Sequence, residues 1–188
     1  MNNKIYIKNM VCPRCIKIVR ALFENLEIEI SAIQLGEVTT IEKVENNKRP
    51  ELEKQLFENG FELLKDDKSK ILGQIKSLII EQIHYKKENL KVNFSTFISA
   101  NLNQEYSSLS KLFSSVEGIT IERYIVKQKI EKVKELLFYN QLTLSEIAFQ
   151  MNYSSTAHLS AQFKKETGMS PTKYKQLKLP NRQAIDSI

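Results

Sequence analysis

Two cysteines near the start of the 188-residue chain are the side chains best suited to chemistry. Cys12 and Cys15 are separated by Pro13 and Arg14. Thiolates are soft metal ligands, and two of them at i and i+3 at a helix start can point together, where the helix N-terminus favours the anionic form. The pair predicts binding of a soft metal ion, with Cu(I) favoured over Mg or Ca. A redox-active pair and two inert cysteines are the alternatives.

The surroundings of the cysteines limit the coordination that they can offer. No histidine lies in the first 66 residues, so Zn would need ligands from elsewhere. Two sulfurs alone imply a linear site, a site completed by a small thiol, or one shared between two chains. Met10 is expected in the core rather than at the metal. The N-terminus lacks an apolar signal-like run and no stretch is long enough to span a membrane, so we expect a soluble, cytoplasmic protein with reduced cysteines.

The elements around the cysteines predict a small domain over residues 1–66. Lys4–Lys8 alternates polar and apolar residues, as a strand does, and a helix follows directly after the cysteine loop. Strands are expected at 28–34, 39–44 and 61–64, and a helix at 51–59 with Leu52, Leu56 and Phe57 facing inward. The order strand, helix, strand, strand, helix, strand predicts an α+β domain of the ferredoxin-like, split βαβ class.

The cysteine segment also resembles a known family. Asn9-Met10-Val11-Cys12-Pro13-Arg14-Cys15, with Gly60-Phe61 before the last strand, is similar to the heavy-metal-associated domain of copper chaperones and metal-pumping ATPases. Asn9 stands where that family has Gly, and Val11 where it has Thr. The resemblance covers the first third of the chain and implies that Cys12 and Cys15 are the metal ligands.

Charge divides the chain into two parts. Residues 1–68 carry 11 Lys and Arg against 12 Asp and Glu, whereas residues 69–188 carry 17 against 10. Clustered cations gain affinity by releasing counterions from phosphates, so a basic second part favours a polyanionic partner. A solvated basic surface is the alternative.

The second part begins at a polar break, where Ser69 is the expected helix cap. A helix with an apolar stripe follows, ending near residue 87. Residues 93–118 and 143–168 then share one pattern, a short helix, a turn of three or four residues and a longer helix. This is the helix-turn-helix pattern, and it predicts an all-α domain over residues 69–178 with two such units joined by a long helix. Residues 179–188 are interpreted as a tail.

The second part resembles AraC-type transcription regulators over residues 72–177. The matching segments are Ile147-Ala148, Asn152-Tyr153-Ser154-Ser155, Phe163 to Pro171, Tyr174, and Thr120 to Tyr124 leading into Lys129 to Leu137. Asn152 stands where the family favours Gly, Lys129 where Arg is usual, and Val133 where Ala is usual. The resemblance implies a double-stranded DNA partner. A connecting helix over 120–137 would span about 27 Å at about 1.5 Å per residue. Successive major-groove faces lie about 34 Å apart, so one monomer can read two of them.

Exposed positions on the two longer helices are the candidate DNA contacts. Lys164 and Lys165 are assigned to phosphates, which position a protein without specifying sequence. Ala161 lies where the family often has Arg. The other candidates are Tyr106, Ser107, Ser110 and Lys111 in the first unit, and Thr156, His158 and Ser160 in the second.

Together these patterns predict a sequence-specific DNA-binding transcription regulator that responds to a soft metal ion at Cys12 and Cys15. A homodimer is one possible state of the protein. One alternative is a regulator that uses the cysteine pair as a redox switch. Another is a metal carrier whose helical part docks to a protein. We do not expect the protein to be an enzyme, because neither histidine has a nearby nucleophile in the sequence pattern and no phosphate-binding glycine loop stands out.

Overall fold

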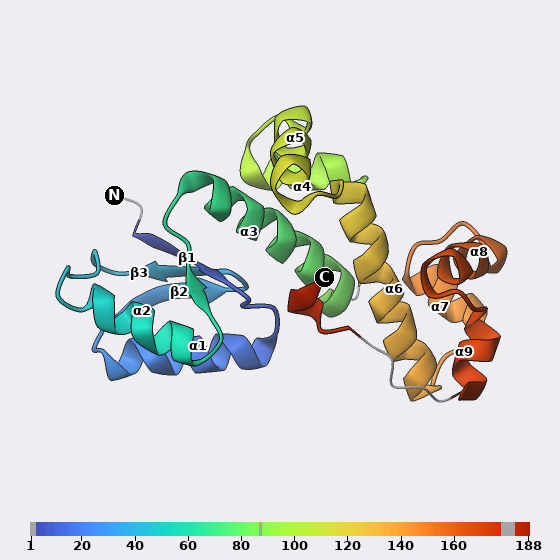
Figure 1. Cartoon of the computed structure of the whole chain (residues 1–188), viewed down its shortest axis with the longest axis horizontal. Helices are drawn as coiled ribbons and strands as arrows, with labels where there is room; N and C mark the ends of the chain where they lie inside the picture. Colours follow the sequence, from blue (N-terminus) through green and yellow to red (C-terminus); the bar gives the residue numbers. More distant parts are fainter. Residues whose placement is uncertain (1–2, 87, 178–182) are drawn as a thin grey trace. The chain divides into compact units, whose positions relative to one another are not determined.

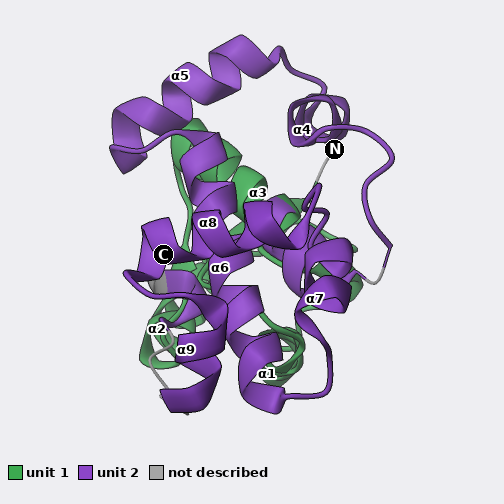
Figure 2. Cartoon of the chain, turned by 90° about the vertical axis from the view of Figure 1, so that its right-hand side faces the viewer, with its two compact units in different colours: residues 1–78 green, residues 79–188 purple. Residues whose placement is uncertain are grey.

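A computed structural model describes residues 3–86, 88–177 and 183–188 of the chain. The chain forms two compact units, residues 1–78 and 79–188 (Figure 2). The boundary predicted at residues 66–69 precedes helix α3 (Asp67–Ile80), most of which belongs to the first unit. Among the described helices, none combines the length and apolar character that a membrane span requires.

The first unit is built on a four-stranded antiparallel sheet with the predicted element order. The strands are ordered β2-β3-β1-β4, and Ile7 of β1 lies opposite Leu63 of β4. The Thr40 hydroxyl donates to the Glu42 carbonyl (2.6 Å) and turns the chain, so β3 ends at Thr40 and the predicted extent of 39–44 is wrong. The elements are β1 (Lys4–Lys8), α1 (Pro13–Asn25), β2 (Ile30–Gln34), β3 (Glu37–Thr40), α2 (Arg49–Glu58) and β4 (Glu62–Leu63).

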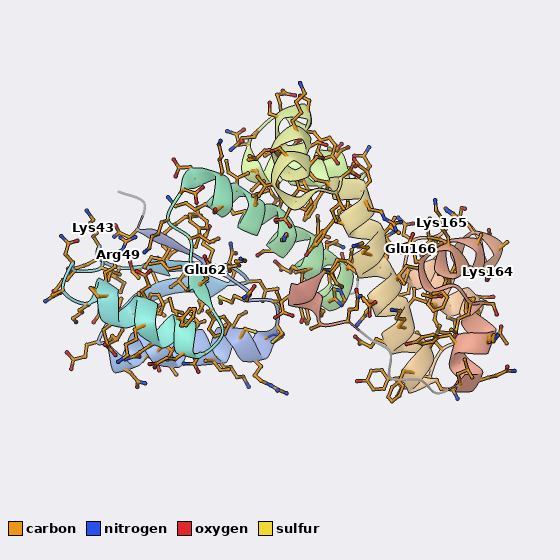
Figure 3. The ribbon with its side chains drawn as sticks, viewed as in Figure 1. Lys43, Arg49, Glu62, Lys164, Lys165 and Glu166 are labelled. Atoms are coloured by element: carbon orange, nitrogen blue, oxygen red, sulfur yellow. The ribbon has the colours of Figure 1, made fainter. Side chains whose placement is uncertain are left out.

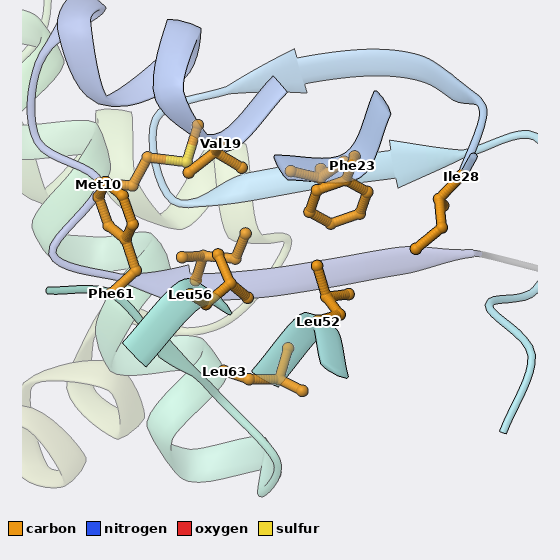
Figure 4. Close-up of a cluster of buried hydrophobic side chains, with 10 residues drawn as sticks. Met10, Val19, Phe23, Ile28, Leu52, Leu56, Phe61 and Leu63 are labelled. Carbon is orange, nitrogen blue, oxygen red and sulfur yellow. The ribbon is translucent and has the colours of Figure 1, made fainter. Parts of the chain in front are cut away.

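Helices α1 and α2 cover one face of this sheet and enclose its core (Figures 1 and 4). Met10 is 1% exposed, which confirms it as a core residue. Leu52 and Leu56 of α2 are buried as predicted, but Phe57 is 77% exposed and its inward prediction is wrong. Successive helical residues are rotated by about 100°, so the residue after Leu56 leaves the narrow buried stripe.

Helix α3 covers the opposite face of the sheet. Ile7 points into the core, so Tyr6, its neighbour on the strand, faces the other way. The Gln74 amide lies 3.4 Å from the Tyr6 hydroxyl, and a Cβ added to Gly36 would lie 2.3 Å from the Ser77 hydroxyl oxygen. The close approach requires a glycine at position 36, which has φ of 74°.

The start of α3 differs from the prediction in its capping residue. The Asp66 carboxylate accepts the Ser69 backbone N–H at 2.9 Å, so Asp66 caps the helix and Ser69 lies inside its first turn. Hydrogen bonds from the Ser69 side chain, and then from its backbone N–H, favour the Asp66 anion and lower the pKa of Asp66. At its other end α3 passes into a π-helical segment, η1 (Glu81–Tyr85), which belongs to the second unit.

The second unit is helical and its boundaries follow local capping chemistry. Side chains of Asn93, Thr120, Thr143 and Ser155 each accept a backbone N–H at a helix start. Left-handed residues end four helices, two of them at glycine. The helices are α4 (Phe94–Leu102), α5 (Tyr106–Glu117), α6 (Ile121–Tyr139), α7 (Leu144–Gln150), α8 (Thr156–Thr167) and α9 (Pro171–Leu177), followed by a short 3₁₀ turn, η2 (Ile185–Ser187).

A buried polar network lies on α6. Gln128 is fully buried, and its amide oxygen lies 2.8 Å from Nε2 of His84 in η1. Its amide nitrogen donates to the Tyr124 hydroxyl and to the Ile185 carbonyl, at 3.0 and 3.2 Å. Of the tail predicted at 179–188, residues 179–182 lie outside the described residues. The Gln183 backbone N–H donates to the Glu131 carboxylate of α6 at 3.0 Å, so the tail contacts α6 at Gln183 and Ile185.

Candidate nucleic-acid interface and cysteine pair

The second unit contains two copies of one helical arrangement. Helices α4 and α5 pack together at the start of α6, and α7 and α8 do so further along it (Figure 1). The longer helix of each copy buries a leucine and a phenylalanine, and that phenylalanine meets a tyrosine of the next helix edge-on, at 5.6 Å and 5.4 Å between ring centroids. These sets recur at the same spacing: Leu109, Phe113 and Tyr124, then Leu159, Phe163 and Tyr174. The two helix-turn-helix units are confirmed.

Polar contacts fix the second helix-turn-helix unit to α6. Arg123, in the first turn of α6, forms an ion pair with Glu166 of α8, whose side chain is 7% exposed. Lys129 donates to the Met151 carbonyl at 2.8 Å and lies 5.2 Å above the ring of Tyr153, in the turn between α7 and α8. Burial lowers the pKa of Lys129, since desolvation disfavours its charged form. The turn and α8 are therefore held by different points on one helix.

The predicted contacts in the first unit lie on α5 but differ in accessibility. Ser107 and Lys111 are exposed, and Ser110 is half-buried. Tyr106 is half-buried and its hydroxyl donates to the Glu122 carboxylate at 2.5 Å. Burial, with the adjacent carboxylate, raises the pKa of Tyr106 well above its ordinary value. The Tyr106 hydroxyl is thus engaged with α6, and Ser107 and Lys111 are the accessible candidates.

The predicted contacts in the second unit lie on α8. His158, Lys164 and Lys165 are exposed, whereas Thr156 and Ser160 are half-buried. Lys164 and Lys165 lie in the last turn of α8, next to Glu166 (Figure 3). Cations near a helix C-terminus are favourable for the helix itself, and exposed ones can also meet phosphates.

Two residues that were not among the predicted DNA contacts lie against His158. Oγ of Ser154 lies 3.0 Å from Nδ1 of His158, and the Tyr153 ring meets the imidazole edge-on at 5.3 Å between centroids. Both residues belong to the turn before α8. The spacing of four between Ser154 and His158 was the available signal, because it brings a turn residue over the first helical turn.

The cysteine pair lies at the start of α1. Cys12 is the N-cap residue, so the helix begins within the pair rather than directly after it, and the Cys15 N–H donates to Sγ of Cys12 at 3.4 Å. The two Sγ atoms are 2.9 Å apart. Burial and the hydrogen bond with Cys12 raise the pKa of Cys15, against the expected preference for thiolate.

The described residues bring no further acidic, histidine or cysteine ligand to the pair, since they contain no group of three or more such side chains placed to hold a metal. The arrangement offers two sulfurs, both half-buried. Two sulfurs fit a soft ion of low coordination number, or an ion whose other ligands come from outside the described chain.

Comparisons with known proteins find a family match within the second unit. Residues 98–177 match a family model described as a helix-turn-helix domain. A protein named "Probable transcriptional regulator LumQ" from Photobacterium leiognathi is 33% identical over 95 residues, 50% of this chain and 36% of that protein. The HTH-type transcriptional activator RhaR of Salmonella arizonae is 32% identical over 69 residues, 37% of this chain and 24% of that protein. The chain thus spans about a third or less of these curated relatives.

Solved structures agree on the fold. The C-terminal domain of AraT, a response regulator from Geobacillus stearothermophilus, aligns with 63% of this chain and 92% of its own at 26% identity and a TM-score of 0.50. A transcriptional regulator of the AraC-type DNA-binding group from Chromobacterium violaceum aligns with 59% and 94% at 18% identity and a TM-score of 0.51, which shows the fold alone. The relatives are named as regulators rather than enzymes, in line with the expectation for this chain. The second unit therefore carries a helix-turn-helix domain, with the fold of these regulator domains.

Proposed function

We propose that the helix-turn-helix domain of the second unit is of the AraC type and that the protein is a sequence-specific DNA-binding transcription regulator. The observation that carries this proposal is the repeated pair of helix-turn-helix units on one helix, each presenting exposed polar side chains on its longer helix. Recognition helices in such units enter the major groove.

The dimensions and charge of the second unit support a double-stranded DNA partner. Helix α6 has 19 residues and is about 28 Å long at about 1.5 Å per residue, against about 34 Å for one turn of the duplex. Residues 69–188 carry a formal charge of +7 with neutral histidines, which favours a polyanion. A single chain offers two groove-reading helices, so DNA binding does not require a homodimer.

The proposal is tested by fluorescence anisotropy of the full chain with duplex DNA from upstream of its own gene, between 50 and 200 mM salt. We expect affinity to fall steeply with salt, and the Lys164→Ala/Lys165→Ala variant to have a log–log slope shallower by about 2, since each lost phosphate contact removes about 1. Competition with unrelated duplex DNA measures sequence specificity. Binding that is absent, or independent of salt, would contradict the proposal.

We also propose that the first unit is a ferredoxin-like domain in which Cys12 and Cys15 bind a soft metal ion, with Cu(I) favoured, and that binding changes DNA affinity. The strand order β2-β3-β1-β4 with two helices on one face supports the domain class. The two sulfurs at a helix start support the ligand class, and Cu(I) would supply a positive charge shared by both thiolates. A shared ion could join two copies of the chain.

The redox alternative rests on the same pair, because 2.9 Å between the Sγ atoms needs only a small approach to form a disulfide of about 2.05 Å. The raised pKa of Cys15 does not separate the two functions, because the thiolate is both the metal ligand and the form that reacts in disulfide exchange. A metal carrier with a docking helical part remains the third function to distinguish.

One titration separates these functions. Reduced protein bound to DNA is titrated anaerobically with Cu(I) or Zn(II), beside the Cys12→Ser/Cys15→Ser variant. A stoichiometric change in DNA affinity that the variant lacks supports metal sensing, and one ion per two chains supports a homodimer. A change only on reversible oxidation supports the redox switch. Metal binding without any DNA binding supports the carrier.

A further inference from the structure

We infer that His158 is the base-reading side chain of the second helix-turn-helix unit, and that it selects guanine as a hydrogen-bond donor in the major groove. The inference rests on the proposed DNA binding and adds which residue of α8 confers sequence preference, and for which base.

The first argument is the position of His158 on α8. It is the third residue of the helix, and its side chain is exposed. The N-terminal residues of a recognition helix are those that reach base edges, whereas Lys164 and Lys165 lie in the last turn. His158 therefore lies where bases are contacted, and the two lysines where a phosphate contact suffices.

The side chains near His158 on α8 are poorly suited to contact a base. Ala157 and Ala161 are the exposed residues on either side along the helix, and neither carries a polar side-chain atom. Thr156 and Ser160 are short and half-buried. Gln162 is also half-buried, and its amide donates to Glu166 at 3.2 Å. Within the first two turns of α8, His158 is thus the long polar side chain that is exposed.

The turn before α8 fixes the orientation of the imidazole ring. Nδ1 lies 3.0 Å from Oγ of Ser154, and the Tyr153 ring packs edge-on against it with an interplanar angle of 87°. The His158 backbone N–H donates to Oγ of Ser155 at 3.1 Å, which holds the first helical turn. A side chain ordered before binding loses less conformational entropy when it meets its ligand.

The Tyr153 ring, which packs against His158, is itself held in place by Lys129 of α6. The ammonium of Lys129 lies 5.2 Å above the Tyr153 ring, and also donates to the Met151 carbonyl. The ring that supports His158 is therefore itself held against the connecting helix. Ser154 and Tyr153 act as positioning residues, and His158 as the residue that meets the base.

The hydrogen bond to Ser154 sets the chemistry of the other ring nitrogen. If the Ser154 hydroxyl donates to Nδ1 of the neutral ring, Nε2 carries the proton; if Nδ1 donates to Ser154, Nε2 of the neutral ring accepts; in the cationic ring both nitrogens carry protons. We assign the first and third of these states, in which Nε2 is a donor. Guanine presents two adjacent acceptors in the major groove, N7 and O6, while cytosine presents a donor there. The arrangement thus favours guanine and disfavours cytosine at one base pair of the site.

The inference is tested by selection from a randomised duplex DNA pool with the full-length wild-type chain, followed by affinity measurements on the selected site. Three variants are compared: His158→Ala, Ser154→Ala, and Lys165→Ala as the phosphate-contact control. Each conserved guanine of the site is then replaced singly by 7-deazaguanine, which lacks the N7 acceptor. Far-UV circular dichroism verifies that each variant is folded.

We expect His158→Ala to lose about ten-fold in affinity for the selected site, to lose the guanine preference at one position, and to become indifferent to 7-deazaguanine there. Ser154→Ala should show a smaller deazaguanine penalty, and Ser154→Thr, which keeps the hydroxyl, should restore it. Lys165→Ala should weaken binding to all sequences alike.

Two results would overturn the inference. If His158→Ala selects the same bases as the wild type, His158 is not the reader, although DNA binding stands. If the wild-type chain binds DNA without selecting any sequence, the proposed regulator function fails and the inference fails with it.

Discussion

Replacement of Gly36 by alanine tests the contact between α3 and the sheet. Gly36 has φ of 74°, a region that costs a residue with a Cβ about 1 to 2 kcal/mol. The new Cβ would also lie 2.3 Å from the hydroxyl oxygen of Ser77 on α3, and such overpacking costs about 1 to 3 kcal/mol. We expect Gly36→Ala to destabilise the first unit by about 2 to 5 kcal/mol.

Gly60 provides the matched control for the backbone cost. It has φ of 80°, and an added Cβ would meet nothing within 4 Å. Gly60→Ala should therefore cost only about 1 to 2 kcal/mol, and the excess of Gly36→Ala over Gly60→Ala measures the approach of α3. Ser77→Ala removes the hydroxyl oxygen, so the double variant Gly36→Ala/Ser77→Ala should recover most of that excess.

Hydrogen exchange resolved by peptide is the appropriate assay, because a chain with two units need not unfold in one step. Peptides covering β3 and the first part of α3 should exchange faster in Gly36→Ala than in Gly60→Ala, and peptides from α7 and α8 should not change. Equal protection of β3 and α3 in the two single variants would refute the contact of α3 with this face of the sheet.

Three further outcomes concern α6. Tyr106→Phe removes the hydrogen bond that lowers the pKa of Glu122; the stability difference from the wild type should be present at pH 7 and vanish as the pH falls through the lowered Glu122 pKa, and thermal melts over a descending pH series check this. Gln128→Leu removes three hydrogen bonds of a fully buried amide and should cost about 2 to 4 kcal/mol by urea denaturation, so a neutral result would contradict the buried network. Arg123→Ala deprives the nearly buried Glu166 of its ion pair and should lower stability by about 1 to 3 kcal/mol, an effect absent if the pair forms only at the surface.

The sequence pattern predicted those elements whose boundaries are set by interactions between residues close in sequence. Capping side chains such as Thr120 and Thr143, and the left-handed Asn152, act within a few residues, so the helix-turn-helix units were predicted closely. Met10 was assigned to the core from its residue type alone. The predicted exposure of His158 and Lys164 also followed from helical periodicity.

The sequence pattern did not predict features that depend on tertiary contacts. An apolar stripe does not reveal what it packs against, so the contacts of Gln74 with Tyr6 and of Ser77 with the Gly36 turn were not predicted for α3. Phe57 was predicted inward by its hydrophobicity, yet Leu52 and Leu56 already fill the buried stripe of α2. The contacts of Ser154 with His158 and of Arg123 with Glu166 depend on side-chain directions that periodicity does not give.

The extension of α3 across the boundary determines how the protein can be divided. A fragment that ends at Lys68 would lack Gln74 and Ser77 of α3 and would leave the Tyr6 and Gly36 face of the sheet bare to water. That fragment is therefore expected to be less stable than the intact first unit. A piece that ends after Leu78 keeps its own cover, and proteolytic nicking of the intact chain should spare the whole of α3.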